Sequence, residues 1–463
     1  MRTLKLGLLT VILLTLCVGS LFAGGFALSG IGSKAISLGG AFRGLADDGT
    51  AMYWNPAGLG FMERSFITLA GAGIMPVAEY QSEDILPGIS GEAITAEEKL
   101  WLFPNLYAVK GGQSRMKFGL GVYVPYGLGA EWDIYDLPTG NFNLISPTDT
   151  TLTAITWSEG FPEKEMMSSI GIVDIHPTVA YQFSEHFALG AGLSVYYGMI
   201  EITKVKPHGT FGYNLPTLME LEGTGLGFGG NLGLMYKINE HATMGISGKM
   251  PAKVKMDGEA TVRTWLSNYV NYMSQVMAEN PNAYLYAVNA VIGDTTDIKA
   301  DLNLPGDIGF GVSIKPNPRW TINADVSYTF WNTLNTIIIE FDPPAVIGPT
   351  TMEESEMITL WKDTFRFSFG TEYKFNKVAL RGGFFYDESP IPYNTLNPTL
   401  PDISDKYSGN VGLGFHLGNW IIDVNYEHIM FDERKITPQT SENMFGIYNS
   451  SVDAFNFGLT FLF

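Results

Sequence analysis

The chain has 463 residues and a formal net charge of −19, with 16% charged and 13% aromatic residues. Its acidic excess argues against nucleic-acid binding, which requires basic surface to neutralise phosphates. Beyond residue 23, no apolar run is long enough for a membrane-spanning helix. An aromatic-rich and glycine-rich chain of this kind is typical of a transmembrane β-barrel, with a large secreted all-β protein as the alternative.

Residues 1–23 have the pattern of a cleaved secretory signal peptide. An apolar stretch from Leu6 to Val18 follows a basic start, and small residues come after it. The stretch is too short to span a membrane, and the small residues predict cleavage after Ala23 or Gly25. The single cysteine, Cys17, would be removed with this segment, so no disulfide is expected in the mature protein.

Residues 24–64 have the composition of a compact plug. They contain a Gly39-Gly40-Ala41 segment, two adjacent aspartates and an Asn-Pro turn. Small, flexible residues followed by a tight turn favour neither a strand nor a long helix. The candidate functional residues of the plug are Phe26, Asp47, Asp48, Asn55, Pro56 and Ala57.

After the plug, apolar and polar residues alternate with a period of two, most clearly from Phe365 to Phe375 and from Phe455 to Phe463. This alternation places one face of each strand in lipid and the other in a polar lumen. About 14 strands are predicted, at residues 65–75, 100–110, 116–130, 170–183, 186–203, 223–237, 241–257, 305–316, 319–340, 361–375, 377–388, 406–417, 419–436 and 451–463.

Short turns alternate with long loops, such as 131–169 and 258–304, and this alternation is typical of outer-membrane barrels with periplasmic termini. The predicted organisation is therefore a signal peptide at 1–23, an N-terminal hatch at 24–64 and an all-β, antiparallel transmembrane barrel at 65–463.

An ordered set of motifs resembles the FadL family of outer-membrane channels for long-chain fatty acids and other hydrophobic molecules (OMPP1/FadL/TodX). The turn Asn55-Pro56-Ala57 is followed in family order by Gly121-Val122-Tyr123, Trp361-Lys362-Asp363, Leu380-Arg381-Gly382-Gly383 and Leu400-Pro401-Asp402. The resemblance implies passive lipid transport through a 14-stranded barrel with its hatch in the lumen. It also implies an outer-membrane location in a Gram-negative-type bacterium, contact with outer-membrane lipid and lipopolysaccharide, a monomeric state, and no cofactor.

The resemblance places a lateral wall opening at Pro125, Tyr126 and Gly127, and ligand binding is expected to move the hatch and open it. Pro125 has no backbone N–H and cannot complete a strand ladder. A proline at a simple strand end is the alternative.

Four charged residues, Asp325, Arg366, Glu372 and Arg381, face the lumen by strand parity. Charges at membrane depth belong inside the barrel, paired with one another or with the plug. A structural ion network is one interpretation. The sharper hypothesis is that Arg366 or Arg381 anchors the hatch through Asp47 and Asp48.

In the predicted loop 258–304, apolar residues recur at helical spacing, and they predict a helix that forms an external apolar groove for substrate. These residues are Trp265, Leu266, Tyr269, Met273 and Met277. Packing of this helix against another loop is the alternative.

Long-chain fatty acids are the first expectation for the substrate. However, Ile337–Ile339 stands where the resemblance would place a basic partner for a carboxylate. Neutral hydrophobic compounds such as monoaromatic hydrocarbons are therefore an alternative, as is a passive porin or structural barrel. No Ser/His/acid set or metal-binding spacing stands out, so neither catalytic residues nor a metal site is predicted and the protein is not expected to be an enzyme.

Overall fold

The computed structural model describes residues 25–82, 91–135, 143–144, 155–156, 162–206, 217–266, 290–347, 350–400, 402–437 and 444–463. The strands are β1 (Phe66–Ser82), β2 (Ala93–Thr95), β3 (Trp101–Lys110), β4 (Met116–Trp132), β5 (Asn143–Leu144), β6 (Ile155–Thr156), β7 (Met166–Gln182), β8 (Phe187–Lys206), β9 (Thr217–Asn239), β10 (Ala242–Lys249), β11 (Ala252–Leu266), β12 (Ala290–Leu304), β13 (Asp307–Asn317), β14 (Trp320–Thr329), β15 (Thr336–Ile347), β16 (Thr350–Ile358), β17 (Thr364–Phe375), β18 (Val378–Asp387), β19 (Lys406–Leu417), β20 (Trp420–Phe431), β21 (Arg434–Ile436) and β22 (Gly446–Leu462). The short helices are α2 (Ser33–Ser37), α3 (Ala51–Trp54) and the 3₁₀ turns η1 (Pro56–Phe61) and η2 (Trp331–Thr333). Within the described ranges, no helix has both the length and the apolar character to cross a membrane.

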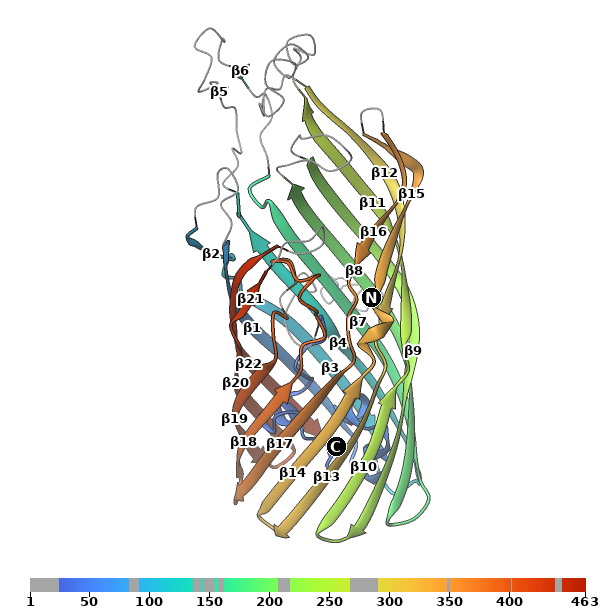
Figure 1. Cartoon of the computed structure of the whole chain (residues 1–463). Coiled ribbons are helices and arrows are strands. Elements are labelled where there is room, and N and C mark those ends of the chain that lie inside the picture. Colours follow the sequence, from blue (N-terminus) through green and yellow to red (C-terminus); the bar gives the residue numbers. More distant parts are fainter. Residues whose placement is uncertain are drawn as a thin grey trace, which may run out of the picture.

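Antiparallel pairing of neighbouring strands closes a 14-stranded barrel (Figure 1). The seam is the β1–β22 pair, which runs in register from Phe66–Leu462 to Ser82–Gly446. Four of the barrel strands consist of two segments each: β10 with β11, β12 with β13, β14 with β15, and β16 with β17. The predicted fold class and strand number are therefore confirmed.

The lengths of several strands differ from the prediction. The predicted loops 258–304 and 341–360 contain paired strands of the β11–β12 and β15–β16 hairpins. These hairpins extend above β10, β13, β14 and β17 in Figure 1. Where a hairpin rises beyond the lipid, neither face needs to be apolar, so the period-two signal fades although the backbone pairing continues.

The prediction of an apolar helix in the loop 258–304 is wrong for the part of this loop that the structure describes. Trp265 and Leu266 lie in β11, which pairs with β12 up to Leu266 opposite Ala290. Tyr269, Met273 and Met277 lie outside the described residues. Their role in a substrate groove remains a prediction.

The alternation of side chains in the barrel wall follows the predicted pattern. On β17, Phe367 and Phe369 are 49% and 51% exposed on the outer face, whereas Ser368 and Gly370 between and beside them are buried. The apolar outer face meets lipid, and the inner face surrounds the hatch.

The hatch, residues 25–64, fills the lumen near the short-turn end and carries α2, α3 and η1. Glycines of the wall allow its turn at Pro56 to approach closely. A Cβ atom on Gly233 would lie 2.7 Å from the Pro56 Cδ atom, and one on Gly190 would overlap the backbone of Pro56 and Ala57. The hatch therefore packs directly against the backbone of β8 and β9 at these two glycines.

We predict that Gly190→Val loosens the hatch, because the new side chain must displace the backbone at Pro56 and Ala57. The measurement is single-channel conductance in planar bilayers, which should rise. Gly409→Val is the matched control, since a Cβ atom at that exposed strand glycine meets nothing within 4 Å. Equal conductance in the two variants would contradict this seating of the hatch.

Candidate transport pathway

The ladder between β3 and β4 is incomplete. The two strands pair only from Leu106–Val122 to Lys110–Phe118, although both continue beyond that point. β4 then has an irregularity between Tyr123 and Tyr126 in its pairing with β7. Pro125 lies within it and has no N–H to donate. The wall therefore has a gap in its hydrogen bonding beside the predicted lateral opening.

The start of the hatch supplies the missing partner strand. Ala27 forms an antiparallel bridge with Tyr126. The Leu28 N–H donates to the Pro125 carbonyl at 3.1 Å, and the Gly127 N–H donates to the Phe26 carbonyl at 2.7 Å. The three residues predicted to form the opening thus contact the N-terminal segment directly, and this segment covers the gap.

The Phe26 ring lies in a box of three aromatic side chains, which we call the aromatic box. Ring centroids of Tyr126, Trp331 and Trp361 lie 5.6, 5.4 and 5.8 Å from that of Phe26. Phe26 is only 3% exposed. Burial of a phenylalanine side chain is worth about 1.5–3 kcal/mol, so the box holds the segment against the wall.

A buried carboxylate holds the residue before Phe26. The Gly25 N–H donates to Asp402 Oδ2 at 2.7 Å, and Lys406 Nζ donates to Asp402 Oδ1 at 2.7 Å. Burial raises the pKa of Asp402, while Lys406 and the Gly25 N–H oppose that shift. Gly25 has a φ of +62°, and a Cβ atom there would clash with Trp331 and Trp361. Backbone conformation and space therefore both require glycine.

Buried apolar side chains of the inner wall and of residues 391–403 pack into one cluster around the aromatic box, and we call this lining the apolar chamber. Lumens of outer-membrane barrels are usually polar, so this lining is informative. Its buried side chains include Ile170, Ile172, Tyr196, Val254, Met256, Leu302, Leu304, Ile391, Leu396 and Ile403. A further apolar cluster continues toward the end opposite the short turns and contains Ile202, Leu221, Ala260, Ile298, Ile339 and Phe341. A hydrocarbon in contact with this lining would gain roughly 25 cal/mol per Å² of apolar surface removed from water.

The Asn-Pro-Ala turn fastens the hatch below the chamber. Asn55 Nδ2 donates to the carbonyls of Arg43 and Leu234 at 2.9 and 3.1 Å, and its Oδ1 accepts from the Ala57 N–H at 3.2 Å. Asn55 is fully buried, so the loss of any of these hydrogen bonds would leave a buried polar group unpaired and destabilise the folded state. The amide joins two segments of the hatch and the barrel wall.

Arg43 is a second anchor, and the sequence analysis did not identify it. Its guanidinium donates to Asp307 and Ser247 at 3.2 Å each, and its backbone N–H donates to Asp325 at 2.7 Å. Asp325 also accepts from the Phe42 N–H at 3.0 Å. Asp325 therefore bonds to the hatch backbone. The only feature of the sequence that could have indicated this role is the presence of an arginine in a glycine-rich segment.

The predicted charge network divides into two parts. Arg366 donates to the hatch carbonyls of Ser29 and Gly39 at 2.6 and 3.4 Å. Arg381 instead pairs with Glu372 at 2.7 Å and with Asp423 at 2.5 Å, all within the wall. Arg366 thus holds the hatch through backbone carbonyls, whereas Arg381 ties neighbouring strands together.

The hypothesis that Asp47 and Asp48 receive these arginines is wrong. Asp47 pairs with Lys34 of the hatch itself at 2.6 Å. Asp48 accepts from the Thr50 N–H at 2.8 Å and from its hydroxyl at 2.6 Å. Burial raises the pKa of Asp48 to about 6. Both aspartates therefore organise the hatch internally.

An acid, a hydroxyl and an imidazole meet on β7 and β8. Ser194 Oγ donates to Asp174 Oδ2 at 2.9 Å and lies 2.9 Å from His176 Nδ1. His176 Nε2 lies 3.2 Å from Asn231 Oδ1, and Asn231 Nδ2 donates to the hatch carbonyl of Met52 at 2.7 Å. The hydroxyl gives its hydrogen to the carboxylate, and the network bonds to the hatch through Asn231.

A closed 14-stranded barrel with a hatch in its lumen and an apolar outer face defines an outer-membrane channel protein. A sequence model of the family described as outer membrane protein transport protein (OMPP1/FadL/TodX) matches residues 14–463, and the chain belongs to this family. The family resemblance inferred from the motifs is thereby confirmed.

Named relatives cover nearly the whole chain. It is 23% identical to the long-chain fatty acid transport protein of Escherichia coli O6:H1, over 95% of this chain and 94% of that protein. It is 25% identical to the 47 kDa outer membrane protein of Pasteurella multocida, over 94% of this chain and 95% of that protein.

Among solved structures, a Pseudomonas aeruginosa FadL homologue aligns with a TM-score of 0.72 and 16% identity, over 94% of this chain and 99% of that chain. The Pseudomonas putida toluene transporter TodX aligns with a TM-score of 0.70 and 17% identity, over the same shares of the two chains. The fold is thus shared with both structures.

We predict different outcomes for the two arginines. Arg366→Ala should raise single-channel conductance, because two hatch carbonyls lose their donor. Arg381→Ala should leave conductance near that of the wild type and lower the temperature at which the barrel unfolds on a gel-shift assay, because Glu372 and Asp423 lose a buried cation and Glu372 keeps only the half-exposed Lys374. A conductance increase for Arg381→Ala alone would reverse the assignment.

Proposed function

We propose that the protein carries hydrophobic molecules inward across the outer membrane by passive diffusion, after export with a cleaved signal peptide. The observation that carries the proposal is the position of Phe26, which lies between the apolar chamber and the wall gap at Pro125 to Gly127. A molecule cannot occupy the aromatic box and leave Phe26 in place. Ligand entry and displacement of the N-terminal segment are therefore one event.

The proposed mechanism starts with capture at the apolar cluster that contains Ile298, Ile339 and Phe341. The molecule moves into the apolar chamber, where burial of its hydrocarbon surface provides the driving force. It then replaces Phe26 in the aromatic box. When the segment detaches from Tyr126, the β3–β4 gap loses its cover, and the molecule leaves laterally. The molecule shifts the protein toward the state in which the segment is displaced, and it can do so only because it binds that state more tightly than the closed one.

Two classes of substrate fit this pathway. The name of the Escherichia coli relative supports long-chain fatty acids. For neutral compounds, including monoaromatic hydrocarbons, the support is the state of nearby cations: Lys406 is bonded to Asp402, and Arg434 donates to the carbonyls of Ile403 and Ile391. The Trp361 indole N–H is buried without a partner in the described structure and is available to an uncharged or charged oxygen.

We predict that Phe26→Ala increases the apparent affinity for a hydrophobic ligand, because the ligand no longer competes with the Phe26 ring. The measurement is saturable uptake of radiolabelled oleate and toluene into cells that express this protein as their sole such channel. Phe384→Ala is the control, since that ring is 47% exposed on the outer face. Non-saturable uptake with unchanged Phe26→Ala kinetics would support a passive porin instead.

The substrate class is tested by native mass spectrometry with palmitate, hexadecanol and toluene. We expect retention of hexadecanol comparable to that of palmitate, because no free cation is seen at the described chamber wall. Strong preference for palmitate would show that a carboxylate partner exists, and long-chain fatty acids would then be the favoured substrate class. Palmitate and hexadecanol are unbranched and have the same number of carbon atoms, so the comparison isolates the effect of the head group.

A further inference from the structure

A second break in the wall lies at a distance from the β3–β4 gap along the barrel. β12 pairs with β15 only from Asp297–Asp342 to Ala300–Ile339, and the β13–β14 ladder begins at Asp307–Thr329. Residues 301–306 and 330–338 between these ladders share no register, and η2 occupies the interval. Pro251 and Pro305, neither of which can donate a backbone hydrogen bond, stand at the same level.

Adjacent residues at this break face opposite sides of the wall. Phe330 is 36% exposed and lines a groove on the outer surface, whereas Trp331 is 2% exposed and belongs to the aromatic box. The Tyr126 hydroxyl donates to the Pro305 carbonyl at 3.4 Å. The box that holds Phe26 therefore contacts both interruptions of the wall.

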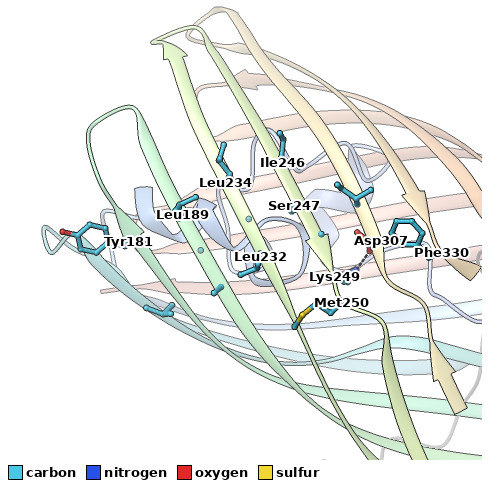
Figure 2. A pocket seen from close by; sticks show the side chains of 16 residues that line it. Tyr181, Leu189, Leu232, Leu234, Ile246, Ser247, Lys249, Met250, Asp307 and Phe330 are labelled. Carbon is cyan, nitrogen blue, oxygen red and sulfur yellow. Dashed lines mark ion pairs between the residues drawn. The ribbon is translucent and has the colours of Figure 1, made fainter. Parts of the chain in front are cut away.

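The outer groove has a volume of about 710 Å³ and lies over β7, β8, β9, β10 and the start of β13. Figure 2 shows Tyr181 and Leu189 toward one end and Met250, Asp307 and Phe330 toward the other. Small residues, Ala191 and Gly248, leave space between larger apolar side chains. The groove thus runs along the lipid-facing wall from the break toward the short-turn end.

The interior approaches the same place. A small cavity of about 70 Å³ lies between hatch and wall. Its lining combines apolar side chains, such as Leu28 and Trp331, with charged ones, among them Arg366 and Asp387. Lys249 and Asp307 line both this cavity and the outer groove, and they form an ion pair at 3.2 Å. Arg43 of the hatch bonds to the same Asp307. Only the wall at Lys249 and Asp307 separates the two spaces.

We propose that this break is a second lateral opening, through which the transported hydrophobic molecule passes from the aromatic box into the outer groove. This inference rests on the proposed function. The occupant of the groove is the hydrocarbon body of the released molecule, because apolar side chains dominate the lining and the cavity behind the wall is lined by Tyr126 and Trp331 of the box.

No strand ladder closes this opening on the β12 side, although on the other side the Asn332 N–H of η2 donates to Asp363 at 2.9 Å. Asn303 Nδ2 donates to the Thr333 carbonyl at 3.2 Å across the unpaired interval, and the Phe330 N–H donates to the Gly306 carbonyl at 2.9 Å. Trp331 fills the remaining space against Phe26. When a ligand displaces Phe26, Trp331 loses a packing partner, and η2 can move without breaking a strand ladder.

The test bridges the opening reversibly. Asn303→Cys and Thr333→Cys are combined, and a short bis-methanethiosulfonate reagent links the two thiols across the interval. Uptake of radiolabelled oleate and toluene should fall about twofold or more and recover with dithiothreitol. Thr261→Cys with Thr295→Cys is the matched control, because those hydroxyls lie 2.9 Å apart in the regular β11–β12 ladder.

A second variant tests the groove without a cross-link. Ala191→Trp should fill the groove and reduce uptake, while Ala108→Trp on β3, outside the groove, should not. Unchanged uptake in both the bridged pair and Ala191→Trp would overturn the second opening. The proposed function fails separately, if the wild-type protein itself gives no uptake above cells that lack it.

Discussion

In lipid, each backbone N–H and C=O group of a barrel wall must find a partner inside the protein, because no water is present to supply one. The strand ladder of this wall is interrupted beside Pro125 and between β12 and β15, and another part of the chain covers each of these interruptions. The N-terminal segment bonds to β4 at Pro125 and Gly127, and η2 with Trp331 fills the interval beside β12. In the described structure both interruptions are therefore covered from the inside of the barrel.

Both covers meet at Phe26. Its ring packs on Tyr126 beside one gap and on Trp331 beside the other, and Gly25 before it is held by Asp402. A single side chain of modest burial energy can therefore couple ligand entry to two parts of the wall. The rest of the hatch is fastened much more strongly, by Asn55, Arg43 and Arg366, so movement can be confined to its first residues.

The division between a firm hatch and a weakly held segment explains the distribution of charge. Arg366 and Asp325 bond to hatch backbone, whereas Arg381 serves the wall alone. The chamber above is apolar, and its nearby cations are occupied by acids or carbonyls. This environment favours the hydrocarbon surface of a hydrophobic molecule, and few charged groups would have to be desolvated when such a molecule binds.

The sequence by itself determined the barrel, because lipid on one side and a lumen on the other impose a period of two that survives in residues such as Phe365 to Phe375. Turn chemistry and ordered motifs also predicted a plug and an opening at the Pro125 segment. The sequence could not reveal the role of Arg43 or the aromatic box, because those contacts join residues a hundred or more positions apart. It missed the partners of Asp47 and Asp48, Lys34 and Thr50, because these nearby residues meet only through the irregular fold of the hatch. It also missed the β11–β12 and β15–β16 hairpins, where the apolar alternation ends but backbone pairing continues. Only the tertiary structure decided which interruptions of the ladder lie side by side with Phe26.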